Sequence, residues 1–252
     1  MNQTHEDFKR RTVLITGASG GLGQAAAVEF AKRGEQVAIH YNQQAKGAVA
    51  LEAELHLAGH SVKAFQADLT DSLQVNRLYD EVEALFGTVD VLINCAGFSE
   101  QALCQEITDD AWRKTMSVNL DASFYCCRRA IPNMIEARKG VILNISSIWG
   151  MTGASMEVHY ATAKAAIIGM TKAMAKELGP SQIRVNCLAP GWIETNMNLE
   201  HDIEVQNVFI SETPLGRIGT PEEMAKWMWF LCSSEASFMT GQVISPNGGV
   251  VV

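Results

Sequence analysis

The sequence predicts an α/β protein in which a doubly wound parallel sheet of about seven strands is covered by helices on both faces. Short apolar, β-branched segments alternate with longer segments of helical period along almost the whole chain. The strand segments are apolar throughout, as expected for strands that are buried on both faces. We expect strands at 12–16, 36–41, 62–68, 89–94, 141–146, 183–188 and 242–245.

The segments between these strands predict helices, and the ends of several carry residues that begin or stop a helix. Gly34 and Gly59 follow two of them, and Thr220-Pro221 predicts the N-cap and first residue of the last. The predicted helices span 22–33, 43–58, 71–86, 108–137, 158–178 and 221–232.

The organisation of the chain is predicted to be simple. No linker or shift in composition divides it, so we expect residues 1–252 to form a single domain. Residues 192–213 are the longest segment without a clear period and follow the sixth strand. A segment this long at that place is typical of a substrate-binding loop, although an ordinary surface excursion is the alternative.

Composition excludes several classes of function. The net charge is -8 and the sequence pI is about 5.3, which argues against a nucleic-acid or anionic-membrane surface. The 6 cysteines form no CxxC pair, and those at 95, 126 and 187 lie in apolar runs. They predict buried thiols in a reducing compartment, with neither disulfides nor a bound metal. Without a signal-peptide core or an apolar run long enough for a membrane span, the protein is expected to be soluble and cytoplasmic.

A glycine-rich turn, Gly17-Ala-Ser-Gly-Gly-Leu-Gly23, joins the first strand to the first helix. Its spacing differs from GxGxxG, and a plain strand-to-helix turn is the alternative interpretation. The context nevertheless favours a loop whose backbone N–H groups bind a pyrophosphate. Other polar or glycine-containing positions fall at the carboxyl ends of the predicted strands, where ligands bind in such sheets. They are Asp68, Asn94, Ser146-Ser147 and Pro190-Gly191.

Tyr160 and Lys164 are four residues apart in a predicted helix, so their side chains share one face. A nearby ammonium favours the phenolate, and we therefore expect Lys164 to lower the pKa of Tyr160 from about 10. Such a pair can act as a general acid or base on a substrate oxygen. His159, next to Tyr160, is expected on the helix surface.

Six motifs in this order resemble those of the short-chain dehydrogenase/reductase family, and the resemblance covers essentially the whole chain. The motifs are Thr16-Gly-Ala-Ser-Gly-Gly-Leu-Gly23, Asn94-Cys-Ala-Gly97, Asn119 within Ser-Val-Asn-Leu, Ser147 thirteen residues before Tyr160-xxx-Lys164, Arg184-Val-Asn-Cys-Leu-Ala-Pro-Gly191 and Asn247-Gly-Gly249. Cys95 stands where the family's second motif has a second asparagine.

The resemblance implies a Rossmann-type oxidoreductase that transfers a hydride between a nicotinamide and a carbonyl or alcohol. Tyr160 would exchange the proton, and Lys164 would lower its pKa and hold the nicotinamide ribose. Ser147 would bind the carbonyl oxygen, with Ser146 as its competitor, and Asn119 would hold a water that links Lys164 to solvent. A sensor protein that has lost catalysis is the remote alternative.

The resemblance also implies the residues that bind the cofactor. NADP(H) is preferred because Tyr41 and Asn42 stand where NAD-binding relatives place an acid. NAD(H) stays open because Gly20 replaces an arginine that many NADP-binding relatives carry. The implied cofactor-binding residues are Gly17, Ser19, Gly20, Gly21, Leu22, Gly23, Tyr41, Asn42, Asp68, Leu69, Asn94, Ala96, Gly97, Tyr160, Lys164, Pro190, Gly191, Ile193 and Thr195.

Within the family, the chain is most similar to reductases of 3-oxoacyl thioesters on acyl carrier protein. Glu194-Thr195 and Leu215-Gly-Arg217 belong to that resemblance. Of two arginines that dock the carrier, Arg138 is present and the other is replaced by Ser181.

The predicted substrate-binding residues include two departures from those reductases. The predicted set is Ser147, Trp149, Glu157 and Tyr160. Trp149 and Glu157 resemble instead the aminopentanone reductases that act on modified elongation factor P, where an acid would suit an amine. That activity, or another small-ketone dehydrogenase of the family, is the alternative.

Assembly is the last expectation from the resemblance. Relatives are usually tetramers built on the long helices after strands four and five and on the C-terminal segment. Here that segment ends in Val250-Val-Val252, and we expect it to be buried at a subunit contact.

Overall fold

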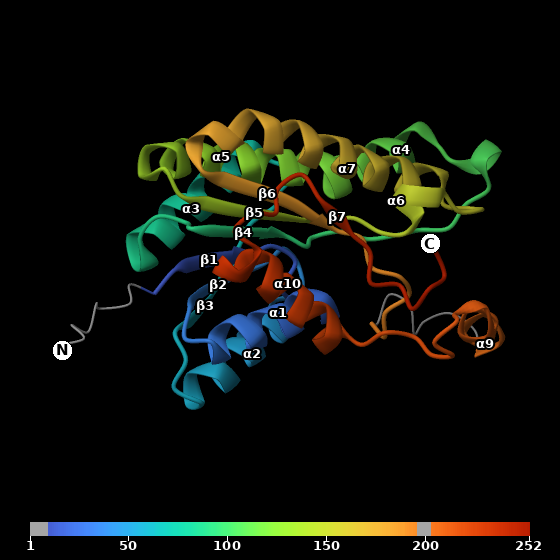
Figure 1. Cartoon of the computed structure of the whole chain (residues 1–252), viewed down its shortest axis with the longest axis horizontal. Helices are drawn as coiled ribbons and strands as arrows, with labels where there is room; N and C mark the ends of the chain where they lie inside the picture. The colour runs from blue at the N-terminus through green and yellow to red at the C-terminus, as the bar shows by residue number, and fades with distance from the viewer. Residues whose placement is uncertain (1–9, 196–202) are drawn as a thin grey trace.

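The computed structural model describes residues 10–195 and 203–252 (Figure 1). Seven parallel strands form one sheet in the order β3-β2-β1-β4-β5-β6-β7. The strands are β1 (Thr12–Ile15), β2 (Gln36–Tyr41), β3 (Val62–Gln66), β4 (Val91–Asn94), β5 (Gly140–Ile145), β6 (Ile183–Leu188) and β7 (Val243–Ile244). The α/β fold and the doubly wound parallel sheet predicted from the sequence are therefore confirmed.

Helices cover both faces of the sheet. The α-helices are α1 (Gly21–Lys32), α2 (Ala45–Leu57), α3 (Ser72–Phe86), α4 (Asp109–Met116), α5 (Ala122–Ala137), α6 (Trp149–Thr152), α7 (Val158–Leu178), α9 (Ile203–Glu212) and α10 (Pro221–Cys232). Short 3-10 turns lie at η1 (Cys104–Glu106), η3 (Gly179–Ser181) and η4 (Ser234–Ala236), and η2 (Ser117–Asp121) is a π-helical turn.

Alternation along the strands divides the core into two layers. Val13 and Ile15 of β1 pack in the layer under α1, α2 and α10, whereas Leu14 packs in the layer under α3 and α5. Figure 1 shows α1, α2 and α10 on one side of the sheet and α3, α5 and α7 on the other. Because both faces are covered, the strands need apolar residues at every position, which explains their continuous apolar runs.

The strand order reverses at β1, which pairs with β2 on one side and with β4 on the other. Loops after these strands separate toward opposite faces and leave a crevice outside the carboxyl ends of the strands. The loop after β1, the segment after β4, α6 and the first turn of α7 all follow carboxyl ends, so they meet at this edge.

Two segments differ from the sequence-based expectation. The helix predicted over 108–137 is divided into α4 and α5 by the π-helical turn η2. The segment 192–213, predicted without regular structure, contains α9. The apolar residues of α9 do not form a core-facing stripe, since Ile203, Val205 and Val208 are exposed, and this hides its helical period. The part of this segment at 196–202 lies outside the described residues.

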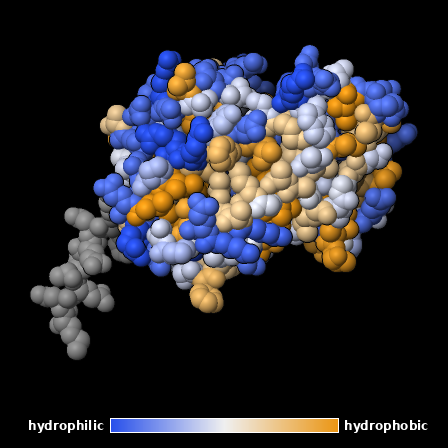
Figure 2. Space-filling view, turned by 90° about the horizontal axis from the view of Figure 1, so that it is seen from above, coloured by the Kyte–Doolittle hydropathy of each residue, from blue (hydrophilic) through white to orange (hydrophobic). Residues whose placement is uncertain are grey.

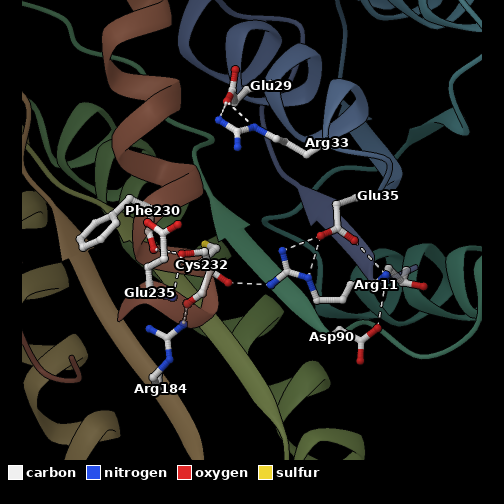
Figure 3. A network of polar contacts seen from close by, with 11 residues as sticks. Arg11, Glu29, Arg33, Glu35, Asp90, Arg184, Phe230, Cys232 and Glu235 are labelled. Atoms are coloured by element: carbon white, nitrogen blue, oxygen red, sulfur yellow. Dashed lines mark hydrogen bonds and ion pairs between the residues drawn. The ribbon is translucent and has the colours of Figure 1, made fainter. Parts of the chain in front are cut away.

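The C-terminal end of α10 is held at the opposite edge of the sheet by two arginines (Figure 3). Arg11 donates from Nη1 to the Cys232 carbonyl at 2.6 Å and from Nε to Glu35 at 2.8 Å. Arg184 donates to the carbonyls of Leu231 and Ser233 at 2.8 and 2.9 Å. These positive charges satisfy carbonyls that the end of a helix leaves without partners, and they favour its negative pole.

Among the described helices, none is long and apolar enough to cross a membrane. All 6 cysteines carry free thiols, and those at 126, 127, 187 and 232 are buried. Within residues 10–195 and 203–252, no group of three His, Cys, Asp or Glu side chains is arranged to hold a metal ion.

Candidate active site

The glycine-rich loop lies against the segment that follows β4. Gly17 has a φ of +67°, and a Cβ there would lie 2.6 Å from Ala96 Cα, so the position requires glycine. α1 begins at Gly21, its N-cap Gly20 makes no side-chain cap, and its first turn carries no acidic residue. A helix N-terminus of this kind suits a pyrophosphate, because its backbone N–H groups and its dipole both favour an anion.

His40 connects the glycine-rich loop to the end of β3. Its ring is 2% exposed, and burial lowers its pKa to about 4, so the imidazole is neutral near pH 7. Nδ1 accepts the Gly17 N–H at 3.2 Å, which leaves the Nε2 proton to be donated to the Ala67 carbonyl at 2.9 Å. The Ala18 N–H donates to the backbone carbonyl of His40 at 2.9 Å. His40 thus fixes the loop from both its ring and its backbone.

Several other positions predicted to bind the cofactor lie near the glycine-rich loop or follow the carboxyl ends of strands. Tyr41 and Asn42 lie at and after the end of β2. Thr195 lies against the glycine-rich loop, because a Cβ on Gly21 would be 3.1 Å from its methyl group. Gly191 packs on Asn247 of the C-terminal segment, where a Cβ would lie 2.7 Å from the Asn247 Cα.

The side chain of Asn94 faces the protein interior, so that only its backbone is left to meet the cofactor that it is predicted to bind. The side chain is 2% exposed and donates to Asn144 Oδ1 at 2.9 Å and to Cys127 Sγ at 3.2 Å. Asn144 in turn donates to Thr171 at 2.9 Å. The amide therefore belongs to a buried polar chain between the sheet and α7, where it satisfies groups that would otherwise be costly to bury.

At the end of β3, the side chain of Asp68 has a local role. Its Oδ1 accepts from the backbone N–H and the hydroxyl of Thr70 at 2.9 and 2.7 Å. Leu69 is 5% exposed and packs in the core layer under α3. Ile193, after β6, is 3% exposed and pairs with Gly219 in an isolated bridge. These three positions thus shape the borders of the crevice through backbone and packing.

Asn119 lies in the π-helical turn η2, and this turn places its amide beside Gly97. Its Nδ2 donates to the carbonyls of Phe98 and Thr115 at 3.0 and 3.2 Å, and its Oδ1 accepts the Phe98 N–H at 3.3 Å. A Cβ on Gly97 would lie 2.7 Å from Asn119 Oδ1 and 3.2 Å from Lys164 Nζ, so both polar groups reach the same point. π-helical turns of this kind are frequent at functional sites.

The two adjacent serines after β5 have different roles. Ser146 is 3% exposed and donates from Oγ to the Lys164 carbonyl at 2.8 Å, which ties β5 to α7. Ser147 is half-buried, lies close enough to Tyr160 to lower its pKa, and accepts the Trp149 N–H at 3.1 Å. This geometry favours Ser147 over Ser146 as the hydroxyl that meets a substrate.

Lys164 is 5% exposed and donates from Nζ to the Ile145 carbonyl at 3.1 Å. Its Nζ is 5.6 Å from the centroid of the Tyr160 ring. Asn119, Ser147, Tyr160 and Lys164 are therefore brought together at the carboxyl edge of the sheet by η2, the segment after β5, and α7.

Burial controls the protonation of this pair in a way that the spacing did not predict. Burial, and secondly the negative charge of Glu157, raise the pKa of Tyr160 above its ordinary value, while the nearby Ser147 hydroxyl acts in the opposite direction. Burial lowers the pKa of Lys164 to about 8. The expected lowering of the Tyr160 pKa by Lys164 is thus not found, since that pKa is raised, and Tyr160 carries its proton near pH 7.

Glu157 is buried beside the site, although it precedes the helix as its N-cap residue. Its side chain makes no capping bond to the helix but accepts a hydrogen bond from the Ser99 hydroxyl. The Ala102 N–H donates to the Met156 carbonyl at 2.9 Å, so the segment after β4 is joined to the start of α7 at two points. Met156 has a φ of +62°, a conformation that a non-glycine residue rarely adopts and that is concentrated at functional sites.

Three residues were missed or misplaced by sequence reasoning. His40 and Ser99 gave no signal, because each acts through a partner far along the chain. His159 is 1% exposed, and its Nδ1 has no hydrogen-bond partner within the described residues, so the expectation of a surface position was wrong. Its place in the first turn of α7, facing the protein, could have been found from the helical period.

Comparison with known proteins agrees with this arrangement over nearly the whole chain. A family model described as "Enoyl-(Acyl carrier protein) reductase" matches residues 17–251. The 3-oxoacyl-[acyl-carrier-protein] reductase FabG of Chlamydia trachomatis is 38% identical over 240 residues, which is 95% of this chain and 97% of that protein. The enzyme of the same name from Thermotoga maritima is 39% identical over 243 residues, 96% of this chain and 98% of that one.

A solved structure extends the similarity to three dimensions. The crystal structure of 3-oxoacyl-[acyl-carrier protein] reductase from Brucella melitensis superposes with a TM-score of 0.91 at 37% identity. It covers 96% of this chain and 91% of that one. With the crevice, the glycine-rich loop and the Ser-Tyr-Lys group in place, these matches establish that the chain belongs to the short-chain dehydrogenase/reductase family and is an oxidoreductase of that family.

Proposed function

We propose that this protein reduces the ketone of a 3-oxoacyl thioester, carried on acyl carrier protein, to the 3-hydroxy form with NADPH. The observation that carries the proposal is the Ser147–Tyr160 pair, two neighbouring hydroxyls beside the buried Lys164. The names of the relatives, which match over almost their whole length, support the substrate class.

The residues of this chain would divide the reaction between binding and proton transfer. The nicotinamide nucleotide, when bound, supplies the hydride. Ser147 and Tyr160 donate hydrogen bonds to the ketone oxygen, where negative charge develops. Tyr160 then gives its proton to that oxygen, and its raised pKa ensures that the proton is present near neutral pH. Lys164 and Asn119 lie behind Tyr160 and offer a route by which the phenolate is reprotonated.

The cofactor preference is supported by the end of β2 and the start of α2. No acid stands at Tyr41 or Asn42 to repel a 2′-phosphate. The first turn of α2 carries no acidic residue but contains Lys46, and a Cβ on Gly47 would lie 3.6 Å from the Ser19 carbonyl oxygen. The positive end of α2 therefore lies against the glycine-rich loop and compensates for the arginine that is absent at Gly20.

We predict that Lys46→Gln weakens NADPH binding about tenfold, measured by fluorescence titration, and leaves NADH binding unchanged.

Turnover decides the reaction class. Wild type and Tyr160→Phe should be compared on acetoacetyl-CoA and acetoacetyl acyl carrier protein, with crotonyl-CoA as a test of enoyl reduction. We expect ketone reduction in the wild type, none above background in Tyr160→Phe, and equal NADPH binding in both. Reduction of crotonyl-CoA alone would overturn the proposal. No turnover of any ketone by either protein would favour a cofactor-sensing protein without catalysis.

Glu157 favours a second candidate, the reduction of an amino-ketone. A carboxylate that is 7% exposed and close enough to raise the pKa of Tyr160 would attract the ammonium of such a substrate. The discriminating measurement is kcat/KM on a small amino-ketone and on acetoacetyl acyl carrier protein, repeated with Glu157→Gln. Inert carrier-linked substrates, together with amino-ketone turnover that depends on Glu157, would make the second candidate correct.

The surface that would dock a carrier protein departs from that of the carrier-protein reductases. Arg138 is engaged in part by the chain itself, since its guanidinium donates to the Pro180 carbonyl at 3.2 Å. The neighbouring Ser181 supplies no positive charge. The net charge of -8 also disfavours long-range attraction of an acidic carrier. The comparison of CoA and carrier-linked substrates above therefore tests the carrier separately from the ketone.

A further inference from the structure

Three aromatic rings from three separate segments meet beside Ser147. Trp149 belongs to α6, Trp192 follows β6, and Phe209 belongs to α9. The Phe209 ring is tilted against that of Trp149, with centroids 5.9 Å apart and an interplanar angle of 59°, and it meets the Trp192 ring edge-on. We name these three residues the aromatic clamp.

α9 is exposed along most of its length. None of the ten residues described in α9 is buried, and its apolar Ile203, Val205 and Val208 are 74%, 40% and 52% exposed. Its C-terminal end is anchored, because Thr213 is 7% exposed and the Leu215 N–H donates to the Gly248 carbonyl at 3.1 Å. Figure 1 shows α9 projecting from the body at the end of the molecule that also carries α6. Through its ring, Phe209 thus joins α9 to Trp149 and Trp192.

The clamp borders the position that a ketone would occupy. The backbone N–H of Trp149 donates to Ser147 Oγ at 3.1 Å, so the indole begins two residues from the hydroxyl that would bind the substrate oxygen. Trp192 directly follows Gly191 at the rim of the crevice, and Gly191 is fixed against Asn247. The substituent of a ketone held by Ser147 and Tyr160 would extend toward these indoles, and the Phe209 ring contacts both of them.

We propose that the aromatic clamp restricts this site to short 3-oxoacyl chains by holding α9 closed over them. This inference rests on the proposed ketone reduction and specifies its substrate. A short chain fits in front of the clamp, whereas a longer chain must displace Phe209 and break its contacts with both indoles. Because the interaction energy of each aromatic pair is small, the loss of the Phe209 contacts should reduce kcat/KM for longer chains by about tenfold.

The test compares 3-oxoacyl-CoA thioesters of about four, eight and twelve carbons, chain lengths chosen to span the clamp. In wild type we expect kcat/KM to fall at least tenfold from the shortest to the longest, mainly through KM. Phe209→Ala should remove most of this difference, and Phe209→Leu, which keeps volume without the ring, should restore part of it. Phe238→Ala is the matched control, since Phe238 is fully exposed, and it should leave the profile unchanged. A flat profile in wild type, or an unchanged one in Phe209→Ala, would overturn the proposal.

A readout without substrate separates failure of the clamp from failure of the proposed function. Phe209→Ala should expose Trp149 and Trp192, so acrylamide should quench tryptophan fluorescence more strongly than in wild type or Phe238→Ala. If wild type reduces none of the thioesters, the proposed function and the chain-length selectivity both fail. Unchanged quenching in Phe209→Ala would show that its ring does not hold α9, and the clamp would then be rejected whatever the turnover.

Discussion

Burial of Lys164 is the residue-scale feature with the largest energetic consequence. The side chain is 5% exposed, keeps a backbone carbonyl as its partner, and has its pKa lowered from 10.5 to about 8. A lowered pKa means that the charged form is less stable in the folded protein than in the unfolded chain. The lysine that the reaction needs should therefore destabilise the fold.

The first prediction is that Lys164→Met raises the free energy of unfolding while abolishing turnover. Below about pH 8 the lysine is charged in both states, and the folded protein bears the whole penalty, up to about 3 kcal/mol for this shift. Between about pH 8 and 10.5 the folded lysine is neutral and the unfolded one still charged, so the penalty fades with rising pH. Urea unfolding of both proteins at pH 7 and pH 9.5 measures the difference, and a gain that grew with pH would contradict the argument.

The second prediction concerns Glu157 and the proton of Tyr160. Its negative charge raises the pKa of Tyr160, so Glu157→Gln should lower that pKa. In the oxidation of a 3-hydroxy substrate, Tyr160 must first lose its proton, and the rate therefore rises with pH. We expect Glu157→Gln to move this rise to lower pH. Ser99→Ala, which removes the hydrogen bond but leaves the charge, should keep the wild-type profile. Equal profiles for all three proteins would count against an electrostatic role of Glu157.

The sequence predicted which residues lie together at the site, but it did not predict their burial or their pKa values. The predicted catalytic set followed from the resemblance of its motifs to those of the family, and the structure brings Asn119, Ser147, Tyr160 and Lys164 together. Their roles stay predictions. The direction of the Tyr160 pKa could not be predicted, because burial and the approach of Glu157 depend on how α6 and α7 pack. His40 was missed for the same reason, since its bond to Gly17 joins segments 23 residues apart.

At the scale of elements, local sequence was most informative where side chains cap the start of a helix. Thr220 accepts the Glu223 N–H at 3.3 Å, and Glu223 accepts the Thr220 N–H at 2.9 Å, which is a complete capping box. Thr220-Pro221 predicted this start correctly. The boundary between α4 and α5 escaped prediction because η2 continues the helical path with a wider turn, and hydrophobic period does not distinguish the two.

The third prediction is that Thr220→Ala lowers the free energy of unfolding by about 1 kcal/mol, the usual effect of losing an N-cap. α10 packs on α1 through Met224, Met228 and Leu231, so a frayed first turn weakens the core layer that supports the glycine-rich loop. Thr162→Ala is the matched control. The Thr162 hydroxyl donates to the carbonyl four residues earlier in an exposed part of α7, and its loss should change stability by less than 0.5 kcal/mol or so. Chemical denaturation measures both, and equal losses would reject the capping argument.

For the molecule as a whole, continuous apolar strands and alternating helices were sufficient to predict one parallel sheet. The same periodicity says nothing about surfaces that a partner would cover. Exposed apolar side chains gather on α4, α5 and the start of α7, where Trp112, Phe124, Ile135 and Val158 are 39%, 41%, 44% and 38% exposed. Figure 2, which looks onto this side of the molecule, shows apolar atoms over the middle of the face.

The last prediction is that the protein is a tetramer held by two different contacts. Four copies with closed symmetry need two self-complementary surfaces, and the chain offers the α4–α5–α7 face and the C-terminal segment that ends in the fully exposed Val252. Phe124→Glu places a charge on the first surface and Val252→Glu places one on the second, so each should reduce the tetramer to a dimer, and the double variant to a monomer. Leu57→Glu is the control, because Leu57 is 91% exposed on α2, away from both surfaces, and it should leave the mass unchanged. Light scattering after size-exclusion chromatography gives these masses. A wild-type monomer at micromolar concentration would refute the assembly, and a tetramer that survived both charges would show that other surfaces hold it.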